Sequence, residues 1–230
     1  FAGMAVGVVI SVIVAFLVGL PTLRLKGDYL AIATLGVAEI IRVAVTNMKI
    51  TNGAAGISGV PLTNTWTITY IALVLTTILI LNYTFSSAGR ATYAVLQDEI
   101  AAESMGVQVT KYKILAFVLG AATASIGGTL SATTLGAVTP SDFTFMKSIE
   151  VLIIVVFGGI GSFTGSFVAA VLLGIINLVL QPFGQLRMII YAVALILIMI
   201  FRPGGLLGTW EFKLGDFKFS KKKETKESGK

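Results

Sequence analysis

Residues 87–113 read SAGRATYAVLQDEIAAESMGVQVTKYK and form the longest polar interval in a chain otherwise built of apolar segments. Within this interval, residues 98–106 are predicted to form a short helix. Asp98 is placed to cap its first turn, because the carboxylate can accept a backbone N–H that has no partner inside the helix. Glu99 adds negative charge at the positive end of the helix dipole, and Gly106 can adopt the left-handed conformation that closes the last turn. A helix with marked ends in a polar interval predicts a surface for a partner.

The composition predicts an integral membrane protein. The chain is 56% hydrophobic and 12% charged, which excludes an ordinary soluble domain. It has no cysteine and no histidine, so disulfides, zinc sites and imidazole catalysis are excluded and no metal site is expected. Eight of the seventeen Lys and Arg lie from Arg202 onward, beyond the last apolar segment. A basic tail beside a membrane indicates a cytoplasmic face, and no nucleic acid is expected as a partner.

Seven apolar segments predict an all-α, polytopic integral membrane helical bundle of about seven spans, since a span needs about 20 residues. A shorter helix is expected inside the polar interval, over residues 89–97. Phe1 lies within an apolar run, so we expect that the natural N-terminus is missing. Residues 1–208 are predicted to form one transmembrane domain and residues 209–230 a disordered basic tail. The expected spans are residues 1–20, 30–46, 66–85, 114–137, 143–157, 163–180 and 186–201.

Parity constrains how these segments cross. If the polar interval and the basic tail both face the cytoplasm, an even number of crossings must separate them. Segment 143–157 must then cross alone, although its 15 residues reach only about 22 Å as a helix. The same parity places loops 47–64 and 137–142 on the outer side, and it places residues 22–29 and the turn 158–162 on the inner side.

The motif at residues 101–106, AAESMG, resembles an Ala-Ala-x-x-x-Gly element that ABC importer permeases carry in a cytoplasmic loop. Ile100 stands where many members have an acidic residue, and Glu99 lies one place earlier. With this variant, the interval is similar to the branched-chain amino-acid permeases of the M type. The resemblance implies that residues 87–113 are a coupling loop whose helix sits in a groove of an ATPase subunit. The residues to which that role is assigned are Asp98, Glu99, Ala101, Ala102, Glu103 and Gly106.

The resemblance implies a permease subunit of an ABC importer in the plasma membrane, which moves leucine, isoleucine or valine inward. Its implied partners are a second permease subunit, two ATP-binding cassette subunits, an extracytoplasmic substrate-binding protein and membrane lipid. The partner subunits are expected to bind and hydrolyse ATP. This chain is therefore expected not to be an enzyme and not to bind a cofactor. Four alternatives stay open: a urea or short-amide permease of the same family, a secondary transporter, a membrane scaffold, and an interfacial helix without a partner.

Two charged residues interrupt the second apolar segment. Glu39 and Arg42 are one helical turn apart near its middle, where charges are costly unless they pair or face a polar cavity. One interpretation is a self-neutralising pair that locks two helices. The other is that the pair lines the translocation path, and a zwitterionic substrate would tolerate it. In a secondary transporter, Glu39 could serve as a proton site.

Two glycine-containing motifs extend the resemblance. The first lies in the predicted outer loop at residues 51–57, with Asn52 in place of a family glycine. Its glycines permit either plain turns or exposed N–H groups at a polar mouth, and the residues are Thr51, Asn52, Gly53 and Gly56. The second lies at residues 158–165. It has no Gly-Lys-Ser/Thr of a phosphate loop, and it predicts helix packing and a cytoplasmic turn formed by Gly158, Gly159, Gly161 and Ser162. A further motif, RPGGLLG at residues 202–208, resembles the family's closing motif.

Overall fold

The computed structural model describes residues 2–25, 27–62, 66–159, 161–180, 189–190 and 193. The chain divides into two compact units, Phe1–Phe145 and Met146–Lys230. The predicted seventh segment, the closing motif and the basic tail lie outside the described residues: 186–201, apart from 189, 190 and 193, together with 202–208 and 209–230.

Four long helices form the frame of the first unit. Each is long and apolar enough to cross a membrane, as the hydropathy of the sequence predicts. Small residues let two of them approach closely, because a β-carbon at Gly7 would lie 3.4 Å from the hydroxyl of Ser125, and one at Gly19 would lie 3.3 Å from the ring of Phe117. The two helices joined by these contacts are α1 (Ala2–Thr22) and α6 (Val109–Leu135). The other two long helices are α2 (Asp28–Asn47) and α3 (Trp66–Phe85).

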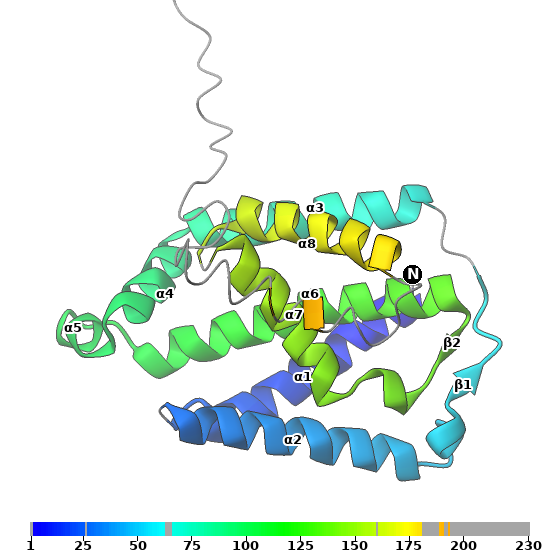
Figure 1. Cartoon of the computed structure of the whole chain (residues 1–230). Helices are drawn as coiled ribbons and strands as arrows, with labels where there is room; N and C mark the ends of the chain where they lie inside the picture. Colours follow the sequence, from blue (N-terminus) through cyan, green and yellow to red (C-terminus); the bar gives the residue numbers. More distant parts are fainter. Residues whose placement is uncertain are drawn as a thin grey trace, which may run out of the picture. The chain divides into compact units, whose positions relative to one another are not determined.

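Shorter elements gather at the two ends of this unit (Figure 1). The helices α4 (Ser87–Gln97) and α5 (Glu99–Ser104) lie at the left end, between α3 and α6. At the right end, strand β1 (Ile57–Ser58) pairs antiparallel with β2 (Ala137–Val138), flanked by the 3₁₀ turns η1 (Gly53–Ala55) and η2 (Pro140–Asp142).

The strand pairing tests the parity of the crossings. Ile57 is paired with Val138, so the loop after α2 and the loop after α6 lie at the same end of the unit. The connection from α1 to α2 lies at the opposite end, together with α4 and α5 (Figure 1). For the loops of the first unit, this is the grouping that the sequence predicts, and the crossing of segment 143–157 stays a prediction.

In the second unit, α7 (Phe145–Gly158) and α8 (Phe163–Leu180) are separate helices joined by a short turn. Their core consists of Phe157, Ala169 and Leu173, and Ile153, Ile154 and Ile176 pack against it. Because α7 has 14 residues, it reaches about 21 Å. The fold is that of a helical membrane protein, and the total of about seven spans stays a prediction.

Candidate functional site

The predicted coupling loop, residues 87–113 (called the coupling loop below), begins where α3 turns directly into α4. Ser86 caps α4, because its Oγ accepts the Gly89 N–H at 3.1 Å. A β-carbon at Gly89 would meet the backbone carbonyl of Tyr83, so only glycine fits this sharp turn. A hydrogen bond of 2.6 Å between the Tyr83 and Thr92 hydroxyls adds a second tie between the helices. The loop is therefore anchored to the end of α3.

Asp98 ends α4 and begins α5. Its backbone is extended, with φ −156° and ψ 113°, and its N–H donates to the carbonyl of Ala94 at 3.1 Å. Its Oδ1 accepts the N–H groups of Ile100 at 2.8 Å and of Ala101 at 3.1 Å. The predicted N-cap is confirmed, and the same residue fixes the bend between the two short helices.

Gly106 closes α5 in the left-handed conformation, with φ 83°. Its N–H donates to the carbonyl of Glu103 at 2.9 Å, and the N–H of Val107 donates to the carbonyl of Ala102 at 3.0 Å. These two hydrogen bonds form a Schellman motif, which satisfies carbonyls that a helix end leaves without partners. The conformation predicted for Gly106 is confirmed.

The coupling loop buries little and exposes several large apolar side chains. Ala102 and Val95 are buried within it. Ile100 is 74% exposed and Met105 is 84% exposed, although both belong to a polar segment. Large apolar side chains that stay exposed in a polar segment are candidates for an interaction surface. The full exposed apolar set of the loop is Tyr93, Leu96, Ile100 and Met105.

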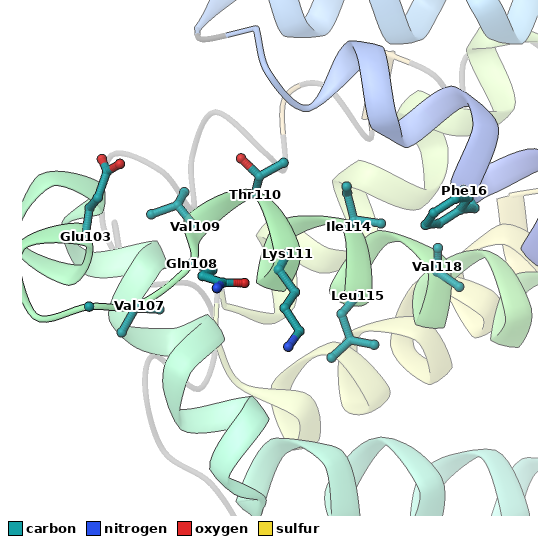
Figure 2. A pocket seen from close by; sticks show the side chains of 11 residues that line it. Phe16, Glu103, Val107, Gln108, Val109, Thr110, Lys111, Ile114, Leu115 and Val118 are labelled. Atoms are coloured by element: carbon teal, nitrogen blue, oxygen red, sulfur yellow. The ribbon is translucent and has the colours of Figure 1, made fainter.

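A groove of about 860 Å³ leads from α5 along α6 (Figure 2). Glu103 stands at its α5 end, and Lys111 projects from the first turn of α6. At the other end, Phe16 of α1 lies beside Val118 of α6. The groove therefore runs from the coupling loop to the packed pair of spans α1 and α6.

An ion pair that sequence reasoning missed joins α5 to α6. The ammonium of Lys113 donates to Oε1 of Glu99, across 14 positions of the chain. The two residues line a second groove of about 880 Å³, together with Phe117 and other mostly apolar side chains. Opposite charges in the middle and at the end of the polar interval were the available signal, but the two residues lie on separate helices, so helical spacing does not relate them.

Glu39 and Arg42 form an ion pair within α2. The Nε–H of Arg42 donates to Oε2 of Glu39 at 2.9 Å, and a second N–H donates to Oε1. The pair is therefore self-neutralising, as one interpretation held, but both partners belong to one helix and the pair itself locks no second helix. The Glu39 side chain is 53% exposed in this chain, and none of the residues of α2, all of them described, is buried.

The glycine-containing loop at residues 51–56 folds back on itself. Asn52 and Gly53 are left-handed, with φ 58° and 60°. The N–H of Asn52 donates to the Lys49 carbonyl at 3.1 Å, and that of Gly56 donates to the Gly53 carbonyl at 3.3 Å. The hydroxyl of Thr51 donates to the end of α2. These N–H groups serve the turns of the loop, which is the simpler of the two predicted uses.

The second glycine motif forms the predicted turn between α7 and α8. Gly159 and Gly161 have positive φ, 118° and 95°. Ser162 is 2% exposed, and its Oγ accepts the Gly165 N–H at 3.0 Å, which caps α8. A β-carbon on Gly158 would collide with the backbone of α8. The glycines thus serve close helix packing.

A second ion pair was also missed in the sequence. Lys147 donates to Oε2 of Glu150 at 2.8 Å, one turn apart in α7. Glu150 lines a small cavity of about 100 Å³ with Asn177 and apolar residues of α7 and α8. Two opposite charges one helical turn apart in an apolar segment would have predicted this ion pair, as they did for Glu39 and Arg42.

Comparisons with known proteins give a consistent result. The profile of the family described as the branched-chain amino acid transport system / permease component matches residues 1–201. The chain is 36% identical to the high-affinity branched-chain amino acid transport system permease protein LivM of Salmonella typhimurium, over 86% of this chain and 55% of that protein. It is also 36% identical to LivM of Escherichia coli, over 84% of this chain and 53% of that protein.

A more distant relative is the permease protein LivH of Escherichia coli, 30% identical over 62% of this chain and 46% of that protein. No solved structure shows a significant match. The chain spans about half the length of the LivM proteins it matches. With the profile match over most of its length, the chain belongs to the family of permease components of the branched-chain amino acid transport system.

Proposed function

We propose that this chain is a transmembrane permease subunit of an ABC importer that translocates leucine, isoleucine and valine, while partner subunits hydrolyse ATP. The family description and the relatives named above support this substrate class. No observation favours a urea or short-amide substrate, a secondary transporter or a scaffold. The proposed partners are a second permease subunit, two ATP-binding cassette subunits, an extracytoplasmic substrate-binding protein and membrane lipid.

One observation carries the mechanistic part of this proposal: α5 is a short helix with both ends closed. Asp98 closes its start and Gly106 its end, while Ile100 and Met105 point large apolar side chains into the surroundings. A protein groove that accepts this helix gains from burying those side chains. The residues proposed to form the coupling helix and close its two ends are Asp98, Glu99, Ala101, Ala102, Glu103 and Gly106.

We further propose the orientation of the chain. The coupling loop, the turn at residues 158–162 and the basic tail face the cytoplasm, and the β1–β2 end of the first unit faces outward. The cationic tail supports this assignment through the positive-inside rule. The outward end carries Thr51, Asn52, Gly53 and Gly56, which we place at the outer mouth of the translocation path.

Glu39 and Arg42 are proposed to line that path. A carboxylate 53% exposed near the middle of a span is unsuited to lipid, because charged side chains in membranes face protein or water. As a bidentate pair within one helix, the two charges cancel and leave polar atoms for a zwitterion. We propose that the bundle has about seven spans within the given sequence.

The ATPase contact is tested by placing a charge on the exposed apolar set. Ile100→Asp and Met105→Asp, each in the assembled complex, are expected to abolish co-purification of the ATPase subunit and leucine uptake into proteoliposomes. A buried carboxylate without a partner is strongly disfavoured at such a contact. The matched control is Ile50→Asp, because Ile50 is 92% exposed and lies in the loop at the other end of the unit. Retention of the ATPase by both coupling-loop variants would contradict the proposal.

The orientation is tested with single cysteines, since the chain has none of its own. In intact cells, a membrane-impermeant maleimide is expected to label Ile50→Cys and to spare Met105→Cys, and both should react after permeabilisation. Labelling of Met105→Cys from outside would place the coupling loop on the wrong side for an ATPase. Uptake of radiolabelled leucine compared with urea in the same vesicles decides the substrate class.

A further inference from the structure

The ion pair between Glu99 and Lys113 is a side-chain tie between the short helix α5 and the long apolar helix α6. Glu99 is the first residue of α5, and Lys113 lies in the second turn of α6. The Lys113 side chain is 21% exposed and that of Glu99 is 38% exposed. A partly shielded pair is screened less by salt and water than a pair on the surface. The geometry therefore favours a persistent contact.

The helix α5 depends on contacts of this kind for its orientation. It has six residues, of which one, Ala102, is buried. Isolated helices shorter than about 12–15 residues are marginal in water, so α5 is held by its caps and its neighbours. The four-residue link from Met105 to Gln108 passes through the left-handed Gly106, and the side chain of Gln108 does not cap α6. Backbone hydrogen bonds of Gly106 and Val107 hold the first half of the link on α5, and no side-chain cap fixes where the link enters α6.

The surroundings of the ion pair strengthen it. The groove that contains it is walled mostly by apolar side chains, including Val95 of α4 and Phe117 of α6. A weakly polar environment raises the strength of a charge-assisted hydrogen bond. Phe117 also lies against Gly19 of α1, so the helix that receives the tie is itself packed on a second span.

We propose that Glu99 and Lys113 are positioning residues that transmit displacement of α5 to α6 and, through α6, to α1. This inference rests on the proposed function, because the displacement comes from an ATPase bound to the coupling loop. Without the tie, α5 still docks on the ATPase, but its movement is absorbed by the link around Gly106. The expected consequence is ATP hydrolysis that is poorly coupled to transport.

The first test measures uptake per ATP hydrolysed by the assembled complex in proteoliposomes. Glu99→Gln and Lys113→Met are each expected to lower this ratio by about fivefold or more, the usual range for coupled sites. The ATPase subunit should still co-purify with Lys113→Met, because Lys113 lies on α6 and not on the docking helix α5. The exchanged pair Glu99→Lys/Lys113→Glu is expected to recover a large part of the ratio, which general destabilisation would not produce. The matched control is Lys111→Met, which removes a cation two positions away on α6 and leaves the pair intact.

The second test needs no ATPase. A spin label at Ser104→Cys, an exposed position of α5 in this cysteine-free chain, reports the mobility of α5 in liposomes. Its mobility is expected to rise in Lys113→Met and to stay unchanged in Lys111→Met.

The outcomes separate the two proposals. If the mobility of the spin label does not change in Lys113→Met, the proposed role of the ion pair is wrong. It is also wrong if the single variants keep the ATPase subunit and the full ratio of uptake to ATP hydrolysed. If the unaltered chain does not bind an ATPase subunit but Lys113→Met still raises the mobility of the label, the ion pair is supported as a tie between α5 and α6. The proposed function is then contradicted.

Discussion

Gly158 and Gly165 pack backbone against backbone where α7 meets α8. A β-carbon on Gly158 would collide with the carbonyl of Gly165, and one on Gly165 would collide with the carbonyl of Gly158. The cap of Ser162 on Gly165 holds the same turn. This contact explains why the turn between two apolar helices is rich in glycine, since any side chain would force the helices apart.

Gly165→Ala is therefore expected to destabilise the second unit by about 1–3 kcal/mol, the range for overpacking a tight contact. The measurement is the loss of folded protein on heating in detergent, followed by size-exclusion chromatography. Gly174→Ala is the control on the same helix, because a β-carbon there meets no atom within 4 Å. Because alanine is a better helix former than glycine, helix propensity alone would stabilise both variants. Equal loss in both variants would therefore contradict the contact with Gly158 as the cause.

Asp98→Ala is expected to loosen α5, because the cap of two N–H groups is lost, at a cost of about 1 kcal/mol. Hydrogen exchange should accelerate at the amides of Ile100 and Ala101, which the carboxylate binds. Asp98→Asn should preserve most of the protection, since asparagine caps helices nearly as well. If Asp98→Asn exchanges as fast as Asp98→Ala, charge at the helix N-terminus matters more than the hydrogen bonds.

Gly106→Val is expected to open the end of α5 by about 1–2 kcal/mol, because a side chain is strained at φ 83°. The space around it is free, with no atom within 4 Å of a β-carbon, so the effect is conformational rather than steric. In the complex, we expect ATPase and uptake to become uncoupled or the ATPase subunit to dissociate. Asparagine tolerates the left-handed region, so Gly106→Asn should show an effect between that of the unaltered chain and that of Gly106→Val. Normal substrate-stimulated ATPase and uptake in Gly106→Val would count against the coupling role.

Removing one member of the Glu39–Arg42 pair is expected to lower the amount of assembled protein more than removing both members. Glu39→Gln leaves an unpaired guanidinium in a span, which membranes tolerate poorly. Glu39→Gln/Arg42→Met carries no charge, and we expect it to insert and assemble as the unaltered chain does, with reduced leucine uptake. Full uptake by the double variant would show that the pair serves structure alone.

Gly56→Ala is expected to disturb the outward end of the first unit more than Gly59→Ala. Both residues have positive φ, 72° and 81°, so the conformational strain is similar. A β-carbon on Gly56 would collide with the carbonyl of Val138, whereas one on Gly59 meets nothing within 4 Å. The difference between the two variants therefore isolates the contact of the loop with β2. Protease sensitivity of residues 48–62 is the measurement, and equal sensitivity would contradict this packing.

The sequence by itself determined the membrane class, the four long helices of the first unit and both ends of α5. These features depend on local chemistry: apolar length sets a span, a carboxylate caps the helix that follows it, and glycine permits the left-handed residue that ends one. Asp98 and Gly106 were predicted in their roles as caps because each role needs only neighbours within a few residues.

Tertiary structure alone decided the contacts between distant positions. It pairs Glu99 with Lys113 and joins Ile57 to Val138. No local pattern encodes these two contacts, because they depend on how α1, α4 and α6 pack and on where the chain turns between them. The physical reason is that residue spacing predicts neighbours along one helix, whereas partners on different helices are set by the packing of the whole unit.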